Sequence, residues 1–157
     1  MTPQDFEELL EFLDETPTFI ASLTANFTGD EWRRKPAKEE FSALEHICHL
    51  RDIEQEGYRL RIDKLLNEAE PFLADIDGDK LAAERNYNSQ DFNKALAAFT
   101  SARKDNIQMI RTLSPPELSR SGKLQNVGII TLEQLLMLMR KHDEAHRLEL
   151  GNSLPRQ

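Results

Sequence analysis

The segment TLEQLLMLMRKHDEAHRLELG, from Thr131 to Gly151, carries the pattern that decides the fold. Its apolar residues recur every three or four positions, which is typical of a helix with one face against a core. Thr131 and Gln134 form a capping-box pattern at its start, and Gly151 is a common residue type at a helix end. The segment therefore predicts an amphipathic helix that ends near residue 151.

Two histidines in this segment, His142 and His146, stand one helical turn apart and continue its apolar stripe. A buried imidazole needs hydrogen-bond partners or a metal ion. Histidines at this spacing also occur on solvated helix faces and in satisfied polar cores. The pair alone therefore leaves a metal site and a purely structural role both open.

Three further segments show the same helical period. Residues 2–27 begin with a capping pattern, and Pro17 is expected to kink or interrupt that helix. A second capping box opens a helix over residues 42–67, and a third helix runs from about residue 89 to Ser114-Pro115-Pro116. Together with the first segment they predict an all-α chain, folded as a four-helix bundle in a single domain over residues 1–157.

The connections between these helices differ in length. Residues 67–87 contain proline, glycine and several acidic residues, and they form a linker longer than a tight helix hairpin needs. Residues 114–130 have the Ser and Gly content of a loop. We find no convincing β-strand in either connection.

The composition is that of an ordinary soluble protein, with 31% charged and 39% hydrophobic residues. The formal net charge of -8 argues against a nucleic-acid surface, which requires a basic patch. No apolar run is long enough for a transmembrane helix, and the first residues lack a secretory signal pattern. We therefore expect a cytoplasmic protein without nucleic-acid or membrane partners.

The other two histidines, His46 and His49, lie near the start of the second helix. At a rise of about 1.5 Å per residue, His49 lies about 10 Å from the start of its helix. The pair of histidines in the fourth helix lies about 10 Å from that helix's end. The two groups are level only if the two helices are antiparallel, which one crossover connection through residues 67–87 would provide. Spacing does not decide whether His46 or His49 would complete a site.

Three imidazoles suit zinc, nickel, iron or copper, whereas magnesium and calcium prefer oxygen ligands. Three protein ligands also leave coordination positions for water or substrate, which is typical of a catalytic rather than a structural site. A ferritin-like di-iron site is disfavoured because the chain contains no Glu-x-x-His sequence.

Several parts of the chain resemble the DinB/YfiT-like superfamily, four-helix bundles regarded as metalloenzymes. The resemblance rests on FSALEHICHLRDIE (residues 41–54), ERNY (84–87), GIITLEQLL (128–136) and HDEAH (142–146), and it extends over most of the chain. It implies a bundle with a single crossover and the metal ligands His49, His142 and His146. Activities known in this superfamily include S-transfer with a thiol cofactor and maleylpyruvate isomerisation.

Two departures from the superfamily pattern concern the substrate pocket. Arg147 and Glu149 stand where relatives often have a further His or a Gln, and residues 124–126 lack a His that some relatives show. The three proposed metal ligands are unaffected by these departures.

Other residues near the histidines have simpler interpretations. Cys48 could act as a nucleophile beside His49, but a lone helical cysteine is more often a small buried residue. Asp52 or Asp143 could hydrogen-bond a ligand imidazole, although a solvated surface position is the simpler expectation for Asp143.

Our first functional hypothesis is a cytoplasmic metal-dependent enzyme, either a transferase or a hydrolase. A divalent transition metal ion (zinc, nickel or iron) would activate water or a low-molecular-weight thiol toward a small-molecule substrate, and no catalytic side chain is assigned. The alternative is a non-catalytic bundle that binds metal or a partner helix. A third hypothesis is a stress-associated binding protein that acts as a homodimer.

Overall fold

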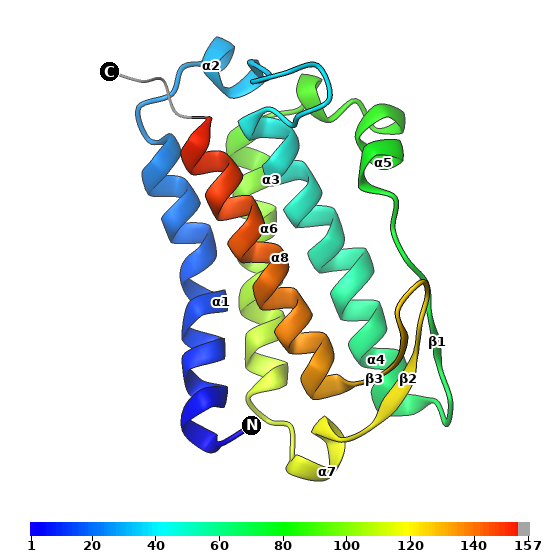
Figure 1. Cartoon of the computed structure of the whole chain (residues 1–157). Helices are drawn as coiled ribbons and strands as arrows, with labels where there is room; N and C mark the ends of the chain where they lie inside the picture. The colour runs from blue at the N-terminus through cyan, green and yellow to red at the C-terminus, as the bar shows by residue number, and fades with distance from the viewer. Residues whose placement is uncertain (154–157) are drawn as a thin grey trace.

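The structure, a computed structural model, describes residues 1–153 and contains four long helical segments (Figure 1). These are α1 (Pro3–Thr24), a composite segment of α3, η1 and α4, then α6 (Phe92–Ile110) and α8 (Leu132–Asn152). The predicted four-helix bundle is therefore confirmed. The prediction of one domain extended to Gln157, and its last four residues lie outside the described part.

The composite segment consists of α3 (Ala43–Asp52), η1 (Ile53–Tyr58) and α4 (Arg59–Asn67), so the helix predicted over residues 42–67 is continuous. Its middle part, η1, is a π-helix, a rare form that is frequent near functional sites. The wider turn of the π-helix, whose hydrogen bonds span five residues rather than four, shifts the faces of α3 and α4 relative to each other. An ideal helical period does not predict this shift.

One long connection sets the topology of the bundle. In Figure 1, α1 and α8 run in one direction, whereas α3–α4 and α6 run in the other. Residues 68–91 carry the chain back along the bundle and include α5 (Gly78–Glu84) and the 3₁₀-helix η2 (Tyr87–Ser89). This is the single crossover, and it makes α3 and α8 antiparallel. That is the arrangement in which the histidines of the two helices can meet.

The expectation of no β-strand is wrong. A small sheet lies at the end of the bundle near the start of α8 (Figure 1), with β1 (Phe72–Leu73) parallel to β2 (Ser121–Leu124). β2 is antiparallel to β3 (Gly128–Thr131), and α7 (Pro115–Leu118) precedes the hairpin. These strands have two to four residues each, too few for an alternating pattern to stand out from a Ser- and Gly-rich loop. The short helix α2 (Gly29–Arg33) lies in the connection between α1 and α3.

The helices start where the sequence predicts, but the predicted kink or interruption at Pro17 is absent. Capping boxes begin α1, α3 and α8 at the predicted positions, and α1 runs through Pro17 without interruption. Proline has no N–H for the carbonyl of Leu13, four residues earlier. That carbonyl instead accepts a hydrogen bond of 2.7 Å from Nη1 of Arg103, which explains why the helix tolerates the proline.

The buried side chain of Arg103, on α6, contacts the other three long helical segments. From α6, its guanidinium donates to the Leu13 carbonyl on α1 and to Asp143 Oδ2 on α8, the latter at 2.6 Å. It also donates from Nη2 to Glu54 Oε2 on η1 at 2.8 Å. Asn106 donates to the second oxygen of Glu54 at 2.9 Å. One cation and two carboxylates thus fix the relative positions of the helices that carry the histidines.

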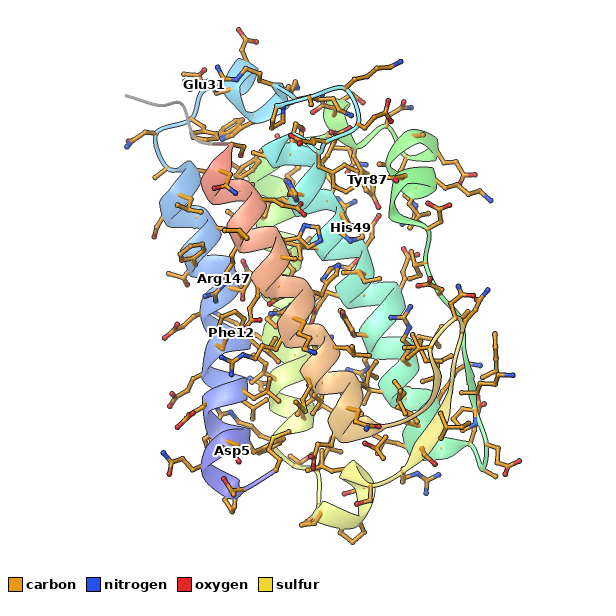
Figure 2. The ribbon with its side chains drawn as sticks, in the orientation of Figure 1. Asp5, Phe12, Glu31, His49, Tyr87 and Arg147 are labelled. Carbon is orange, nitrogen blue, oxygen red and sulfur yellow. The ribbon has the colours of Figure 1, made fainter. Side chains whose placement is uncertain are left out.

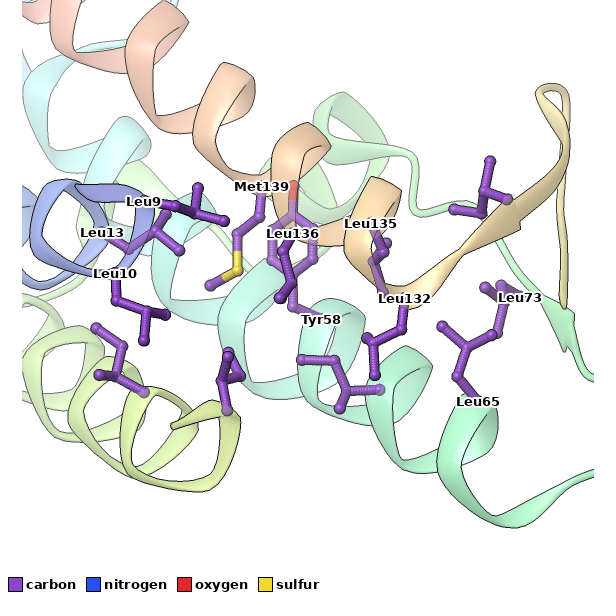
Figure 3. Packing of buried hydrophobic residues seen from close by; sticks show 14 of the residues in the cluster. Leu9, Leu10, Leu13, Tyr58, Leu65, Leu73, Leu132, Leu135, Leu136 and Met139 are labelled. Carbon is purple, nitrogen blue, oxygen red and sulfur yellow. The ribbon is translucent and has the colours of Figure 1, made fainter. Parts of the chain in front are cut away.

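The apolar core has two parts along the bundle. The first joins α1, α4, α8 and the sheet, and its labelled members in Figure 3 are Leu9, Leu10, Leu13, Tyr58, Leu65, Leu73, Leu132, Leu135, Leu136 and Met139. The second surrounds the upper half of α3 and includes Leu44, Ile47, Phe99 and Leu150. His142 and His146 lie along α8 between Met139 of the first part and Leu150 of the second. No helix in residues 1–153 is long and apolar enough to cross a membrane.

Candidate metal centre

The histidines of α3 and α8 lie side by side, toward the start of α3 and the end of α8. Figure 2 labels His49 on α3, beside α8. Its Nε2 atom lies 3.0 Å from Nε2 of His142, and Nε2 of His146 lies 3.1 Å from the same atom. His49, His142 and His146 therefore form one compact group, which we call the His triad, with ligand atoms all within 4.8 Å of one another.

The geometry of the His triad fits a small cation. Two nitrogens at zinc–ligand distance on a tetrahedral ion are about 3.3 Å apart, close to the separations observed. Hydrogen bonds among the three imidazoles would satisfy their nitrogens less completely than a cation would. Nε2 of His142 takes part in both short contacts but carries at most one proton. One cation would accept the lone pairs of all three nitrogens at once.

The triad imidazoles are held in the neutral form that metal binding requires. Burial, followed by the neighbouring imidazole of His49, lowers the pKa of His142 to about 4. Burial also lowers the pKa of His49, against the opposing charges of Asp52 and Asp79. The pKa of His146 is lowered by burial and by the imidazoles around it.

His46 lies next to the His triad but is turned away from its centre. Only 2% of the residue is exposed, and its Nδ1 lies 2.7 Å from Nδ1 of His146. Its other nitrogen, Nε2, lies 3.6 Å from Oε2 of Glu149. Spacing left His46 and His49 as alternatives, and the structure brings His49 into the group with His142 and His146.

The start of α5 packs directly on the ring of His49. A Cβ atom at Gly78 would lie 2.8 Å from Cε1 and 2.9 Å from Nδ1 of that ring, closer than side chains approach. A residue larger than glycine would therefore push the imidazole away. The sequence indicated only a linker here and gave no sign of this contact.

A pocket of about 370 Å³ adjoins the His triad through His146. Phe41 and His46 also line it, together with the carboxylates of Glu39, Glu40, Asp79 and Glu149. Burial and the nearby charge of Glu40 raise the pKa of Glu149. The pocket gives a small molecule access to the imidazoles from an acidic side of the protein.

Arg147 and Glu149, which stand where relatives often have a His or a Gln, point in different directions. Arg147 turns away from the triad toward α1, where its guanidinium lies 4.0 Å from the centre of the Phe12 ring and donates to the Phe12 carbonyl at 2.8 Å (Figure 2). Glu149 instead lines the pocket. Only Glu149 is thus placed to affect a bound molecule.

The remaining candidates have structural roles. Asp143 is fully buried and paired with Arg103, so the expectation of a solvated surface position is wrong. Asp52 accepts hydrogen bonds from Arg51, Arg85 and Tyr87 and bonds no imidazole among the described residues.

Cys48 is buried, as its simpler interpretation predicted, and burial raises the pKa of its thiol to about 11. A thiol with that pKa is a poor nucleophile at neutral pH.

Sequence reasoning missed Arg103. The signal was available, because Arg103 stands between Phe99 and Ile107 at four-residue spacing on the apolar stripe of its helix. A charged residue in such a stripe needs a buried partner of opposite charge.

The sequence model of the DinB superfamily matches residues 12–150 of the chain. The chain belongs to the DinB superfamily. The resemblance based on the histidine motifs is therefore confirmed. No curated protein sequence gives a significant match.

Among solved structures, the DinB-superfamily chain is similar to YfiT from Bacillus subtilis, described as a probable metal-dependent hydrolase with an unusual four-helix bundle topology. The TM-score is 0.89 at 19% sequence identity, over 98% of this chain and 87% of YfiT. Similarity at this identity establishes the shared fold.

Proposed function

We propose that the protein is a metal-dependent enzyme that acts on a small molecule, with His49, His142 and His146 as ligands of a divalent transition metal ion. The observation that carries the proposal is the convergence of three neutral, largely buried imidazoles through their Nε2 atoms beside a pocket. The shared fold with YfiT, a probable metal-dependent hydrolase, supports hydrolysis as the reaction class.

The chemistry follows from the donor set. Zinc, nickel or iron(II) suits three imidazoles, and such an ion supplies Lewis acidity and lowers the pKa of a water molecule or thiol. Three protein ligands leave room for that water or thiol and for the substrate. We propose hydrolysis first, and S-transfer from a low-molecular-weight thiol as the variant in which the thiol replaces water.

The residues of the chain bind and orient rather than react. The buried thiol of Cys48, whose pKa is raised to about 11, is a poor nucleophile at neutral pH, so covalent catalysis by this residue is not part of the proposal. The pocket volume of about 370 Å³ lies in the ordinary range for small-molecule sites. His146 connects the pocket to the metal ligands.

Metal analysis of the untagged protein tests the proposal. We expect about one zinc, nickel or iron ion per chain after loading and dialysis, and turnover of at least one substrate in a panel of small esters, amides and thiol-reactive electrophiles. No binding of any of these metals would refute the proposal. Stoichiometric binding without turnover would instead favour the non-catalytic metal-binding bundle.

The contact between Gly78 and His49 gives a separate prediction. Gly78→Ala is expected to weaken metal binding about tenfold or more, the usual scale for losing the support of a ligand imidazole. Gly151→Ala is the matched control, because a Cβ there meets nothing within 4 Å. Competition with a chromophoric chelator measures both affinities. Wild-type affinity in Gly78→Ala would show that this contact does not position the ring.

A homodimer and a cytoplasmic location stay predictions of the sequence. Light scattering coupled to size-exclusion chromatography would measure the mass in solution. A mass of about twice the chain's 18.1 kDa is the result expected for the dimer.

A further inference from the structure

We propose that His46 is a positioning residue for the proposed metal centre: its Nδ1 accepts a hydrogen bond from Nδ1–H of His146, so that His146 presents an unprotonated Nε2 to the His triad. The effect of this hydrogen bond on metal binding rests on the proposed function. The hydrogen bond itself is a property of the metal-free chain.

The two imidazoles meet in a hydrogen-bonding geometry. Their Nδ1 atoms are 2.7 Å apart and their ring planes are inclined by 79°. His46 is almost fully buried and comes from α3, whereas His146 comes from α8. Two buried nitrogens at this distance require one proton between them, because two lone pairs would repel and two N–H groups would clash.

The surroundings decide which imidazole holds that proton. If His46 donated from Nδ1, His146 would carry its own proton on Nε2, directed at the His triad. If His146 donates, the proton of His46 lies on Nε2, where the carboxylate of Glu149 is 3.6 Å away. The second arrangement places an N–H beside a negative charge and leaves a lone pair for the metal, so it is the favoured one.

His142 gives independent support for this tautomer. Its buried Nδ1 has no hydrogen-bond partner within residues 1–153. In the metal-free chain the proton of His142 is therefore better placed on Nε2, which lies 3.1 Å from Nε2 of His146. Nε2 of His49, 3.0 Å away, can also accept that proton, but a second proton on Nε2 of His146 would face it at 3.1 Å, so the proton of His146 is better placed on Nδ1.

A second metal ion bound by His46, His146 and Glu149 is a competing explanation, since all three are possible ligands. The geometry disfavours it. Two nitrogens on one tetrahedral ion are about 3.3 Å apart, more than the 2.7 Å observed. The nitrogen of His46 that faces Glu149 is Nε2, whereas its Nδ1 is the nitrogen that meets His146.

Two substitutions of His46 separate hydrogen bonding from packing. His46→Asn retains an acceptor oxygen near the position of Nδ1, whereas His46→Phe retains a ring against Phe41 but has no acceptor. Cys48→Ala is the control, because Cys48 is buried on the same helix and its sulfur faces Tyr87 and Gln90.

Zinc affinity by chelator competition is expected to fall about 10- to 100-fold in His46→Phe, and to stay within about threefold of wild type in His46→Asn and Cys48→Ala. Equal losses in His46→Phe and His46→Asn would refute the hydrogen-bonding role. Two zinc ions per wild-type chain, falling to one in His46→Phe, would establish the second metal site instead.

Nitrogen-15 NMR of the metal-free protein tests the tautomer without any metal. We expect His146 to be protonated at Nδ1 in the wild type and to lose this preference in His46→Phe. Protonation of wild-type His146 at Nε2 would overturn the inference. Failure of the wild type to bind zinc would instead count against the proposed function, and the NMR result would still decide the tautomer.

Discussion

Arg103→Met is expected to destabilise the fold by about 3–5 kcal/mol, the usual cost of removing one partner from a buried ion pair. The substitution leaves the carboxylates of Glu54 and Asp143 buried without their cation, and both residues are fully enclosed. It also removes the donor to the Leu13 carbonyl, which Pro17 cannot replace. This loss is a large part of the 5–15 kcal/mol that stabilises a typical domain.

Urea unfolding followed by circular dichroism measures this effect. Arg111→Met is the matched control, because Arg111 follows the same helix and pairs with Glu7 in an ion pair that is about half exposed. Such a pair contributes about 1 kcal/mol or less. Equal stability of Arg103→Met and Arg111→Met would show that the buried charges do not hold the bundle together.

Neutralising the two carboxylates tests whether uncompensated buried charge causes the loss of stability. Adding Glu54→Gln and Asp143→Asn to Arg103→Met should recover part of the lost stability, because the uncompensated charges are then absent. Without recovery, the loss would have to come from packing and from the Leu13 carbonyl rather than from charge.

The sequence predicted the helical elements because their signals are local. Capping boxes at Thr2, Ser42 and Thr131 depend on residues three positions apart, and each begins a helix in the structure. The positions of the histidines along the two helices required an antiparallel pair, and the predicted linker over residues 67–87 was long enough to provide the crossover.

What the sequence did not predict depends on contacts between distant residues. Pro17 predicts a break in its helix, because the sequence does not show that Arg103, 86 positions away, donates to the Leu13 carbonyl. The sheet depends on Phe72 and Leu73 pairing with Lys123 and Leu124, which are distant in the sequence. The contact of Gly78 with His49 depends on where the crossover lies. None of these has a periodic signature.

The His triad combines a local sequence signal with contacts between residues that are distant in the sequence. The turn containing His142 and His146 is a local pattern, and its meeting with His49 follows from topology. The orientation of His46 is set by the neighbouring α8 residues, His146 and Glu149, and spacing along α3 carries no information about it. This is why spacing left His46 and His49 as alternatives.

Loss of stoichiometric metal binding is the expected result of His142→Ala. Nε2 of His142 lies within 3.1 Å of both other triad nitrogens, so its removal leaves only two of the three proposed ligands. Losing a ligand should exceed the 10- to 100-fold effect of losing its support, so we expect affinity to fall more than about 100-fold. Metal content after dialysis should fall from about one ion per chain to nearly none.

Thermal unfolding gives a second readout of the same variant. A ligand at 1,000 times its dissociation constant stabilises a folded protein by about 4 kcal/mol, so wild-type protein should melt at a clearly higher temperature with added zinc. His142→Ala should show almost no such shift. Lys141→Ala, an exposed neighbour on the same helix, should keep it. If His142→Ala retained the wild-type metal content and thermal shift, the ion would have to be bound outside the His triad.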